Sequence, residues 1–227
     1  MKIKNVLISQ PAPVIAEKSP FNEIVLKHRV HVDFHPFIKL EGVSLKEFRG
    51  QRVEILEHSA VIFTSRVTID NFFRICEEAR ITIPETMKYF CNTEAIALYL
   101  QKYIVYRKRK IFFADGTFSS LLELIVKHKD EKFLLTLSEP HKLEMPMALE
   151  KLQLKWDKVI LARTVSADLD SVDMEKYDLL VFYSPSEIAS LLSRFPAETV
   201  HPKIAVFGNG TARAAIEGGL TVSAMAP

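Results

Sequence analysis

Short apolar runs alternate with longer amphipathic stretches along the whole chain, and this alternation constrains the fold more than any other feature. The apolar runs are rich in Val, Ile, Leu and Phe and have the length of strands. The stretches between them carry apolar residues at i, i+3 and i+4, as helices do. Strands that alternate with helices of about ten residues form βα units and parallel sheets. Fully apolar runs such as Val61-Ile62-Phe63 suit sheets covered on both faces. We therefore expect an α/β protein.

The boundaries of the expected elements follow from these patterns. The predicted strands cover residues 5–9, 31–38, 60–64, 88–91, 111–113, 133–137, 159–164, 179–183 and 204–207. The predicted helices cover residues 67–79, 93–103, 119–128, 145–152, 186–195 and 211–217.

A weak internal repeat divides the chain. Residues 60–69 (AVIFTSRVTI) resemble residues 179–188 (LLVFYSPSEI), and Ser65 and Ser184 are offset by 119 residues. Residues 89–95 (YFCNTEA) resemble residues 206–212 (VFGNGTA), and Asn92 and Asn209 are offset by 117 residues. Two matches at nearly one offset predict two related halves of roughly 100 residues each.

The connections between the halves are predicted to be ordered, because no glycine- or serine-rich linker separates them. Two extended segments, residues 31–40 and 158–168, flank the middle of the chain and are the expected linker strands. A chain that crosses twice leaves the first domain discontinuous. We expect residues 1–38 plus 165–227 in domain 1 and residues 39–160 in domain 2.

Composition excludes several classes of function. Thirty Lys and Arg against twenty-eight Asp and Glu leave a net charge of +2, which argues against a general nucleic-acid coat. Only seven glycines are present, and no P-loop or GxSxG motif occurs. No apolar run approaches the ~18 residues of a membrane span. The cysteines, Cys76 and Cys91, make no disulfide framework, which indicates a reducing cytoplasm.

Candidate binding residues occur where the predicted strands turn into helices, because helix starts present free N–H groups to anions at the carboxyl ends of parallel strands. These turns are Ser65-Arg66, Asn92-Thr93, Ser184-Pro185-Ser186 and Asn209-Gly210-Thr211, with Ser9-Gln10 and Ser138-Glu139 as fainter members. The alternative is that they are ordinary helix caps.

Two further patterns allow more than one interpretation. His31, Asp33 and His35 alternate on one strand face and could hold a metal, although a polar strand face is favoured and no metal is predicted. The basic run at residues 106–110 is interpreted as a solvated strand end, ahead of an anionic substrate and then nucleic acid.

Five short motifs, in their order along the chain, resemble those of the uroporphyrinogen-III synthase family. They are residues 6–11 (VLISQP), 33–38 (DFHPFI), 145–149 (MPMAL), 182–186 (FYSPS) and 207–212 (FGNGTA). The resemblance implies two flavodoxin-like parallel-sheet domains joined by a two-stranded β-ladder, with the active site in the cleft between the domains.

The resemblance also implies an activity. Such an enzyme is a hydro-lyase of tetrapyrrole (heme) biosynthesis. It cyclises hydroxymethylbilane, a linear tetrapyrrole with eight carboxylates, to uroporphyrinogen III with inversion of ring D and loss of water. No cofactor, metal, nucleic acid or membrane is implied, and a cytoplasmic monomer is expected. The alternative is a non-catalytic two-domain binder of small polyanions.

Site residues carried over from the resemblance come from the turns and the second linker. The expected substrate-binding residues are Ser65, Arg66, Asn92, Arg163, Ser184, Ser186, Asn209 and Thr211, with Arg107 a weaker candidate.

The chain departs from the family pattern in places. The family often has a tyrosine in the second linker as proton donor, and Ala162 stands there in this chain. Tyr183 and Tyr106 are the remaining candidates for that role. The family generally continues past the segment like residues 221–227 with another helix, so the resemblance implies that the chain ends before a final helix.

Overall fold

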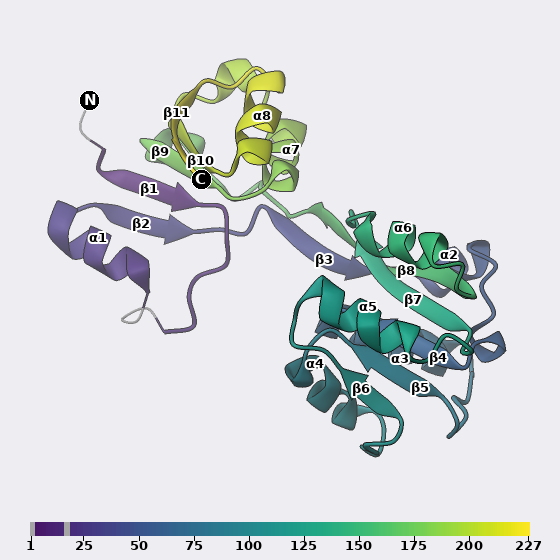
Figure 1. Ribbon diagram of the computed structural model, residues 1–227. Coiled ribbons are helices and arrows are strands. Elements are labelled where there is room, and N and C mark those ends of the chain that lie inside the picture. Colours follow the sequence, from purple (N-terminus) through teal and green to yellow (C-terminus); the bar gives the residue numbers. More distant parts are fainter. Residues whose placement is uncertain (1–2, 16–18) are drawn as a thin grey trace. The chain divides into compact units, whose positions relative to one another are not determined.

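The structure, a computed structural model, describes residues 3–15 and 19–227, which divide into two compact units (Figure 1). The first unit comprises the described residues of Met1–Lys39 together with Thr164–Pro227, and the second comprises Leu40–Arg163. The chain passes between the units within β3 (Ile38–Gly42) and within β8 (Trp156–Ser166), which are neighbouring strands of one sheet.

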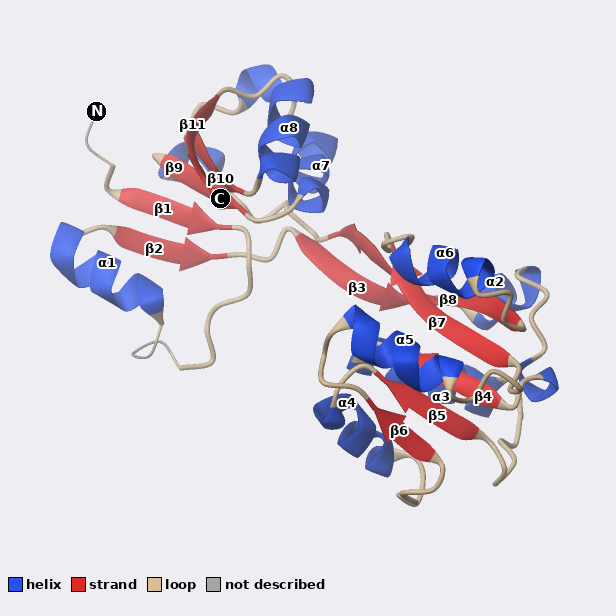
Figure 2. Ribbon diagram, in the orientation of Figure 1, coloured by secondary structure: helices blue, strands red, loops and turns tan. Residues whose placement is uncertain are grey.

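The second unit is built on a six-stranded sheet with the order β3-β8-β7-β4-β5-β6 (Figure 2). Its other strands are β4 (Ala60–Phe63), β5 (Lys88–Cys91), β6 (Ile111–Phe113) and β7 (Phe133–Glu139). Its helices are α2 (Leu45–Gly50), α3 (Arg66–Glu78), α4 (Glu94–Tyr99), α5 (Phe118–Val126) and α6 (Glu144–Lys151). The strands from β8 to β6 pair in parallel.

Both faces of this sheet are covered because successive side chains of a strand point to opposite sides. Val61 and Phe63 pack into a core with residues of α2, α3 and α4, including Phe72. Ala60 and Ile62 face the other way and pack with residues of α5 and α6. All four β4 side chains are fully buried, which explains the uninterrupted apolar run in the sequence.

The first unit is built on a five-stranded parallel sheet with the order β11-β10-β9-β1-β2. Its strands are β1 (Asn5–Ile8), β2 (His31–Phe34), β9 (Leu179–Phe182), β10 (Lys203–Phe207) and β11 (Val222–Ala226). Its helices are α1 (Pro20–His28), α7 (Pro185–Arg194) and α8 (Asn209–Glu217). Residues of α7 and α8 pack with Leu7 and Phe182 on one face, whereas Phe21 of α1 packs with Ile8 on the other.

The two sheets share one topology, permuted along the chain. Reading β6-β5-β4-β7-β8 against β11-β10-β9-β1-β2 matches the sheets strand by strand, with β4 opposite β9 and β7 opposite β1. In chain order the first unit is a 2-1-3-4-5 sheet, the flavodoxin-like order, and the five matched strands of the second unit, without β3, have the order 3-2-1-4-5. The first unit begins with the strands that correspond to the last two of the second, and it is discontinuous because the second unit lies between β2 and β9 in the sequence.

The predicted α/β fold with parallel sheets is confirmed, and each predicted strand and helix has a counterpart. The predicted strand over residues 31–38 is divided, because β2 ends at Phe34 and β3 begins only at Ile38, after Pro36, which cannot donate to a strand ladder. The helix predicted for 93–103 ends at Tyr99 and continues as the 3-10 turn Leu100–Lys102.

Two α-helices and one strand among the described residues were not predicted, namely α1, α2 and β11, and β3 was predicted only in its first residues, as the end of the linker strand 31–40. Strands β3 (IKLEG) and β11 (VSAMA) lie at sheet edges and carry mostly exposed side chains, so the continuous apolar run that marked the central strands is missing from them. Within the described residues, the helices are too short or too polar to cross a membrane.

Candidate functional site

Each sheet has one point at which its connections reverse direction, and ligands of open α/β sheets bind beyond the carboxyl ends of the strands at such points. In the first unit the reversal lies between β1 and β9, and in the second between β4 and β7. The turns that follow β1, β9 and β4 contain Ser9, Ser184 and Ser65. Ser138 and Glu139, expected in a turn, instead form the last two residues of β7, because the strand stays paired with β8 to its end. The neighbouring strands β5 and β10 lead into Asn92 and Asn209.

The turn after β4 presents a cation at a helix start. Ser65 caps α3, and its hydroxyl oxygen accepts a hydrogen bond from the Thr68 N–H at 3.2 Å. Arg66, the first residue of the helix, is exposed, and the first turn contains no acidic residue. The helix dipole and the guanidinium therefore favour an anion at the same place.

A cluster of polar side chains from α3, α4 and the turn after α4 fixes the Tyr99 ring, which lies against Arg66. The Arg66 guanidinium carbon lies 5.2 Å from the centre of the Tyr99 ring, a cation–π geometry. The Tyr99 hydroxyl donates to Asp70 at 2.9 Å, and Lys102 and Tyr103 donate to the same carboxylate. Burial raises the pKa of Asp70, but the hydrogen bonds from Tyr103, Lys102 and Tyr99 outweigh burial and lower the pKa below its usual value. Asp70 therefore stays ionised and fixes Tyr99.

The turn after β9 already contains an anion of its own. Ser184 caps α7 in a capping box with Glu187, whose carboxylate accepts from the backbone N–H groups of Tyr183 at 2.6 Å and Ser184 at 3.0 Å. Glu187 is only 4% exposed. Its carboxylate occupies donors that a substrate carboxylate would need, so the Ser184-Pro185-Ser186 turn is less suited to an anion than its sequence indicates.

In the first unit, the start of α8 is the helix start that suits an anion, as the start of α3 does in the second unit, and no side chain occupies its N–H groups. Gly208, not Asn209 as the sequence indicated, stands at the cap position, in a conformation with φ of 79° that favours glycine, and no side chain caps the helix. Thr211 is only 2% exposed, and its hydroxyl makes no hydrogen bond with any residue that the structure describes. The N–H groups of the first turn, an accessible Asn209 and the Thr211 hydroxyl are therefore available together.

Charge distinguishes these helix starts from one another. Glu94, Glu144 and Glu187 stand in the first turns of α4, α6 and α7, and Asp115 accepts a hydrogen bond from the cap residue of α5. Of the helices that follow carboxyl ends of described strands in the two sheets, α3 and α8 carry no such acid. Each unit thus has one helix start that suits an anionic group.

Structure also places the first turns of α7 and α8 next to each other. A Cβ atom on Gly210 would lie 3.8 Å from the Pro185 ring. The rings of Tyr183 and Phe207, at the ends of the two preceding strands, stack with centres 4.6 Å apart. Burial, and then the charge of Glu187, raise the pKa of the Tyr183 phenol, which keeps it protonated.

Two polar groups at the reversal points were missed or underrated by sequence reasoning. Ser9, a fainter candidate, is 2% exposed at the end of β1, and its hydroxyl has no hydrogen-bond partner among the described residues. His141, which no pattern singled out, follows β7, and both of its ring nitrogens are buried without a described partner. Buried polar atoms without partners are rare and need an explanation, such as a ligand or water.

The remaining candidates lie in less suitable settings. Asn92 precedes Thr93, which is the residue that caps α4. Arg163 already pairs with Glu47 at 2.9 Å, although its Nε atom is buried without a partner among the described residues. Ala162 is fully buried in β8, so no group from this position reaches solvent.

Two basic-run candidates lie at the other edge of the second sheet. Tyr106 and Arg107 precede β6, whereas Asn92 and Arg66 follow strands of the same sheet. The strands of a parallel sheet all begin on one side and end on the other. Tyr106 and Arg107 therefore lie at the amino ends of the strands, and the candidate turns lie at the carboxyl ends.

His31 and Asp33 of β2 form ion pairs, and His35, just after the strand, contacts a backbone carbonyl. His31 Nε2 lies 2.9 Å from Asp33, and Asp33 also accepts from Lys176 at 3.0 Å and from Tyr177 at 2.9 Å. His35 Nε2 contacts the Asp168 carbonyl at 3.0 Å. Among the described residues no three His, Cys, Asp or Glu side chains form a metal-binding group.

Comparison with known proteins gives a family match over most of the chain. Residues 19–227 match the family model described as uroporphyrinogen-III synthase HemD. No curated protein matches the chain significantly.

Solved structures share the fold. A mutant uroporphyrinogen III synthase from the extremely thermophilic bacterium Thermus thermophilus aligns with a TM-score of 0.54 at 16% identity, over 99% of this chain and 92% of that one. The uroporphyrinogen-III synthetase from Helicobacter pylori aligns with a TM-score of 0.59 at 12% identity, over 98% and 92%. At these identities the alignments establish the fold alone.

Proposed function

The chain belongs to the uroporphyrinogen-III synthase family, and on this premise we propose which of its residues hold the substrate. Its reaction is that of the family: hydroxymethylbilane is cyclised to uroporphyrinogen III, ring D is inverted and water is lost. The hydroxyl of the hydroxymethyl group leaves as water, and the methylene carbon left behind bonds to ring D at the ring carbon that is already substituted. The resulting spirocyclic intermediate then fragments and recloses. Catalysis then rests mainly on holding a flexible polyanion in the productive shape.

We propose that substrate carboxylates bind at the starts of α3 and α8. The observation that carries this proposal is that these two helix starts lack the acid found at the others. At α3 the anion contacts the Arg66 guanidinium and the N–H groups after Ser65. At α8 it contacts the free N–H groups of the first turn, Asn209 and the Thr211 hydroxyl. Backbone N–H groups add no formal charge, which explains how a chain of net charge +2 binds a substrate with eight carboxylates.

The other candidates take supporting positions in this proposal. Asn92 lies just before the cap of α4, Ser186 lies in the first turn of α7, and Arg163 lies in the crossing strand β8. Ser184 acts chiefly as the cap that shapes the Tyr183 turn, because Glu187 occupies the neighbouring N–H groups.

We propose Tyr183 as the proton donor to the departing hydroxyl group. Its raised pKa keeps the phenol protonated at neutral pH, as an acid requires, and it stands at the reversal point of the first sheet. Tyr106 is the weaker candidate, because it lies before β6, at the amino ends of the strands in the second unit.

The activity is tested by the isomer that forms. Purified protein is added to freshly made hydroxymethylbilane, and the type I and type III products are separated after oxidation. We expect type III as the main product, because spontaneous closure without ring inversion gives type I. A product ratio equal to that of the protein-free control would instead support a non-catalytic polyanion binder.

Replacing Thr211 by valine is expected to lower kcat/KM about fourfold. Valine keeps the shape of the buried side chain but removes the hydroxyl, and one neutral hydrogen-bond donor contributes about that much. The measurement is steady-state kinetics, with a thermal melt to verify the fold. The control is Ser193→Ala, which removes a hydroxyl from an exposed residue in the last turn of α7, away from the helix starts. It should leave kcat/KM unchanged. Wild-type kinetics of T211V would remove Thr211 from the site.

Replacing Tyr183 by phenylalanine is expected to lower kcat about fivefold with little change in KM. Phenylalanine keeps the stacking on Phe207 while removing the donor, and water can partly replace a lost acid. Because the phenol pKa is raised, the wild-type rate should fall only above about pH 10, where a tyrosine ordinarily ionises. An alkaline limb that is identical in Y183F would assign the proton to another group.

We also propose that the enzyme is a cytoplasmic monomer. Cys76 and Cys91 are both free and buried, and burial raises the pKa of each thiol to about 12, so neither is poised for oxidation. Size-exclusion chromatography with light scattering tests the monomer, since a stable dimer would elute at twice the chain mass.

A further inference from the structure

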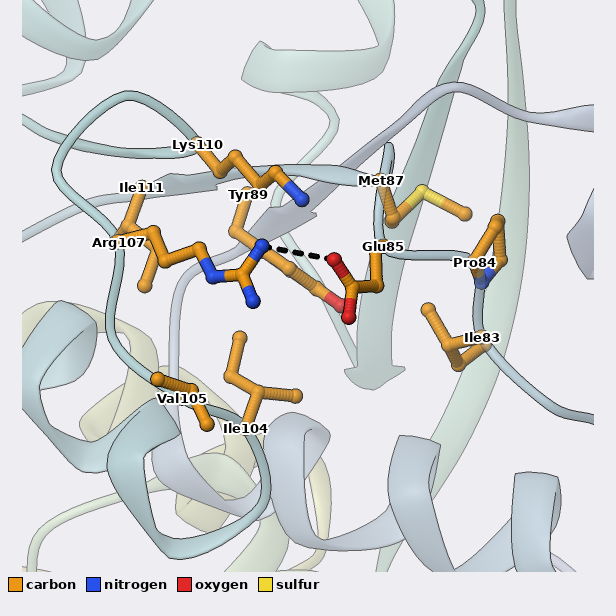
Figure 3. A pocket seen from close by; sticks show the side chains of 10 residues that line it. All are labelled: Ile83, Pro84, Glu85, Met87, Tyr89, Ile104, Val105, Arg107, Lys110 and Ile111. Atoms are coloured by element: carbon orange, nitrogen blue, oxygen red, sulfur yellow. Dashed lines mark hydrogen bonds and ion pairs between the residues drawn. The ribbon is translucent and has the colours of Figure 1, made fainter.

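A pocket of about 190 Å³ lies where β5 and β6 begin, in the second unit (Figure 3). Its walls are mainly apolar and come from the segment before β5 and the segment before β6. The apolar lining includes Ile83, Met87, Ile104, Val105 and Ile111. This amino-edge pocket faces away from the carboxyl ends of the strands, and nothing in the proposed reaction uses it.

One side chain in the pocket offers a hydroxyl group that no described residue binds. Tyr89 is 4% exposed, its ring packs in the core beside Phe63, and its side chain extends into the group of lining residues in Figure 3. Its hydroxyl makes no hydrogen bond with any residue that the structure describes, and burial raises its pKa, so the phenol is a proton donor at all ordinary pH values. A polar group in this position gains free energy when a ligand accepts its hydrogen bond.

The charges at the rim leave an excess of one cation. Arg107 pairs with Glu85 at 2.8 Å among the lining residues, and Figure 3 marks this contact with a dashed line. Lys110 also lines the pocket and forms no ion pair with a described residue. The Tyr89 N–H donates to the Lys110 carbonyl at 2.8 Å, which holds Lys110, the residue just before β6, beside Tyr89 of β5. A single negative charge on the ligand balances this rim.

We propose that the amino-edge pocket binds a small carboxylic acid with a flat apolar body. The volume lies below the roughly 300 Å³ at which drug-sized sites begin, so the ligand is the size of a phenylalkanoate rather than a tetrapyrrole. The carboxylate accepts from the Tyr89 hydroxyl and pairs with Lys110, while the apolar body lies against Ile83 and Ile104. The basic run at residues 106–110 thus contributes a ligand group to a built cavity.

The proposal is tested with 3-phenylpropionate and its neutral amide as probes. The full chain, labelled with ¹⁵N, is titrated with each probe and followed by ¹H–¹⁵N correlation spectra. We expect saturable shifts for the carboxylate that are concentrated in residues 83–89 and 104–111, and at least fivefold weaker binding of the amide. Turnover of hydroxymethylbilane should be unchanged by Lys110→Gln, because the pocket is separate from the proposed reaction site.

Three variants separate the roles of the lining groups. Lys110→Gln and Tyr89→Phe should each weaken binding of the carboxylate about fivefold while the fold, monitored by the same spectra, is retained. Lys108→Gln removes an equal charge from an exposed residue that does not line the pocket, and it should bind like wild type.

The proposal is overturned by any of three results. These are the absence of saturable shifts at millimolar probe, equal affinity for the amide and the acid, and equal weakening by Lys108→Gln and Lys110→Gln. None of these outcomes bears on the isomer assay, so this site can fail while the enzymatic function stands.

Discussion

The variant Arg66→Met should lower kcat/KM for hydroxymethylbilane about thirtyfold, mainly by raising KM. Methionine keeps the length of the side chain and its contact with Tyr99 but removes the only charge at the start of α3. A charge-assisted contact to a carboxylate is worth tenfold or more when it is held by a platform such as Tyr99 and Asp70. Steady-state kinetics of type III formation measure the effect.

A matched control distinguishes this role from a general effect of charge. Arg109→Met removes the same charge from an exposed residue at the opposite edge of the same sheet. It should change kcat/KM by less than twofold, because screening weakens distant charges. If R66M and R109M behave alike, Arg66 makes no specific contact with the substrate, and the start of α3 is only a capped helix.

The variant Asn209→Asp should move stability and activity in opposite directions. A carboxylate at the first position of α8 interacts favourably with the helix dipole, so the free energy of unfolding should rise by up to about 1 kcal/mol. The same charge takes the place of the substrate carboxylate and repels it, so kcat/KM should fall about fifteenfold. Thermal melts and steady-state kinetics on one preparation measure both quantities.

Neutral replacement and salt give the controls for this prediction. Asn209→Ser keeps a short polar side chain without charge and should retain at least half of wild-type kcat/KM. Raising ionic strength from about 0.05 to about 0.5 M should recover part of the N209D activity. Position 209 is exposed, so salt screens the repulsion between the new carboxylate and the substrate. An N209D enzyme with wild-type kinetics would show that no substrate carboxylate approaches α8.

Pattern alone was sufficient for the central parts of both sheets. Val61, Phe63 and Leu180 lie in strands covered on both faces, and such strands form uninterrupted apolar runs in any sequence. The sequence also indicated that Ser65 and Ser184 occupy equivalent positions. Both serines cap a helix, and they do so with nearly the same backbone angles. The edge strand β11 was not predicted. An edge strand can pair with its neighbour through backbone hydrogen bonds without an apolar run in its sequence.

Site residues were less predictable than the fold. A serine before a helix marks a cap whether or not an anion binds there, so the sequence could not rank Ser65, Ser184 and Asn209. The ranking came from Glu187, whose carboxylate folds back on the Ser184 turn, and from Gly208, which leaves α8 uncapped. The unpartnered ring of His141 depends on its burial after β7, which no local pattern indicates.

By itself the sequence determined the class of the fold and where the central strands turn into helices. Those properties are local, because strand runs, helix periodicity and cap residues act within a few neighbouring positions. The tertiary structure alone decided which helix starts are free for an anion, that Tyr106 stands at the far edge from Asn92, and that Tyr89 and Lys110 meet in a pocket. The physical reason is that charge neutralisation and burial depend on residues brought together from distant parts of the chain.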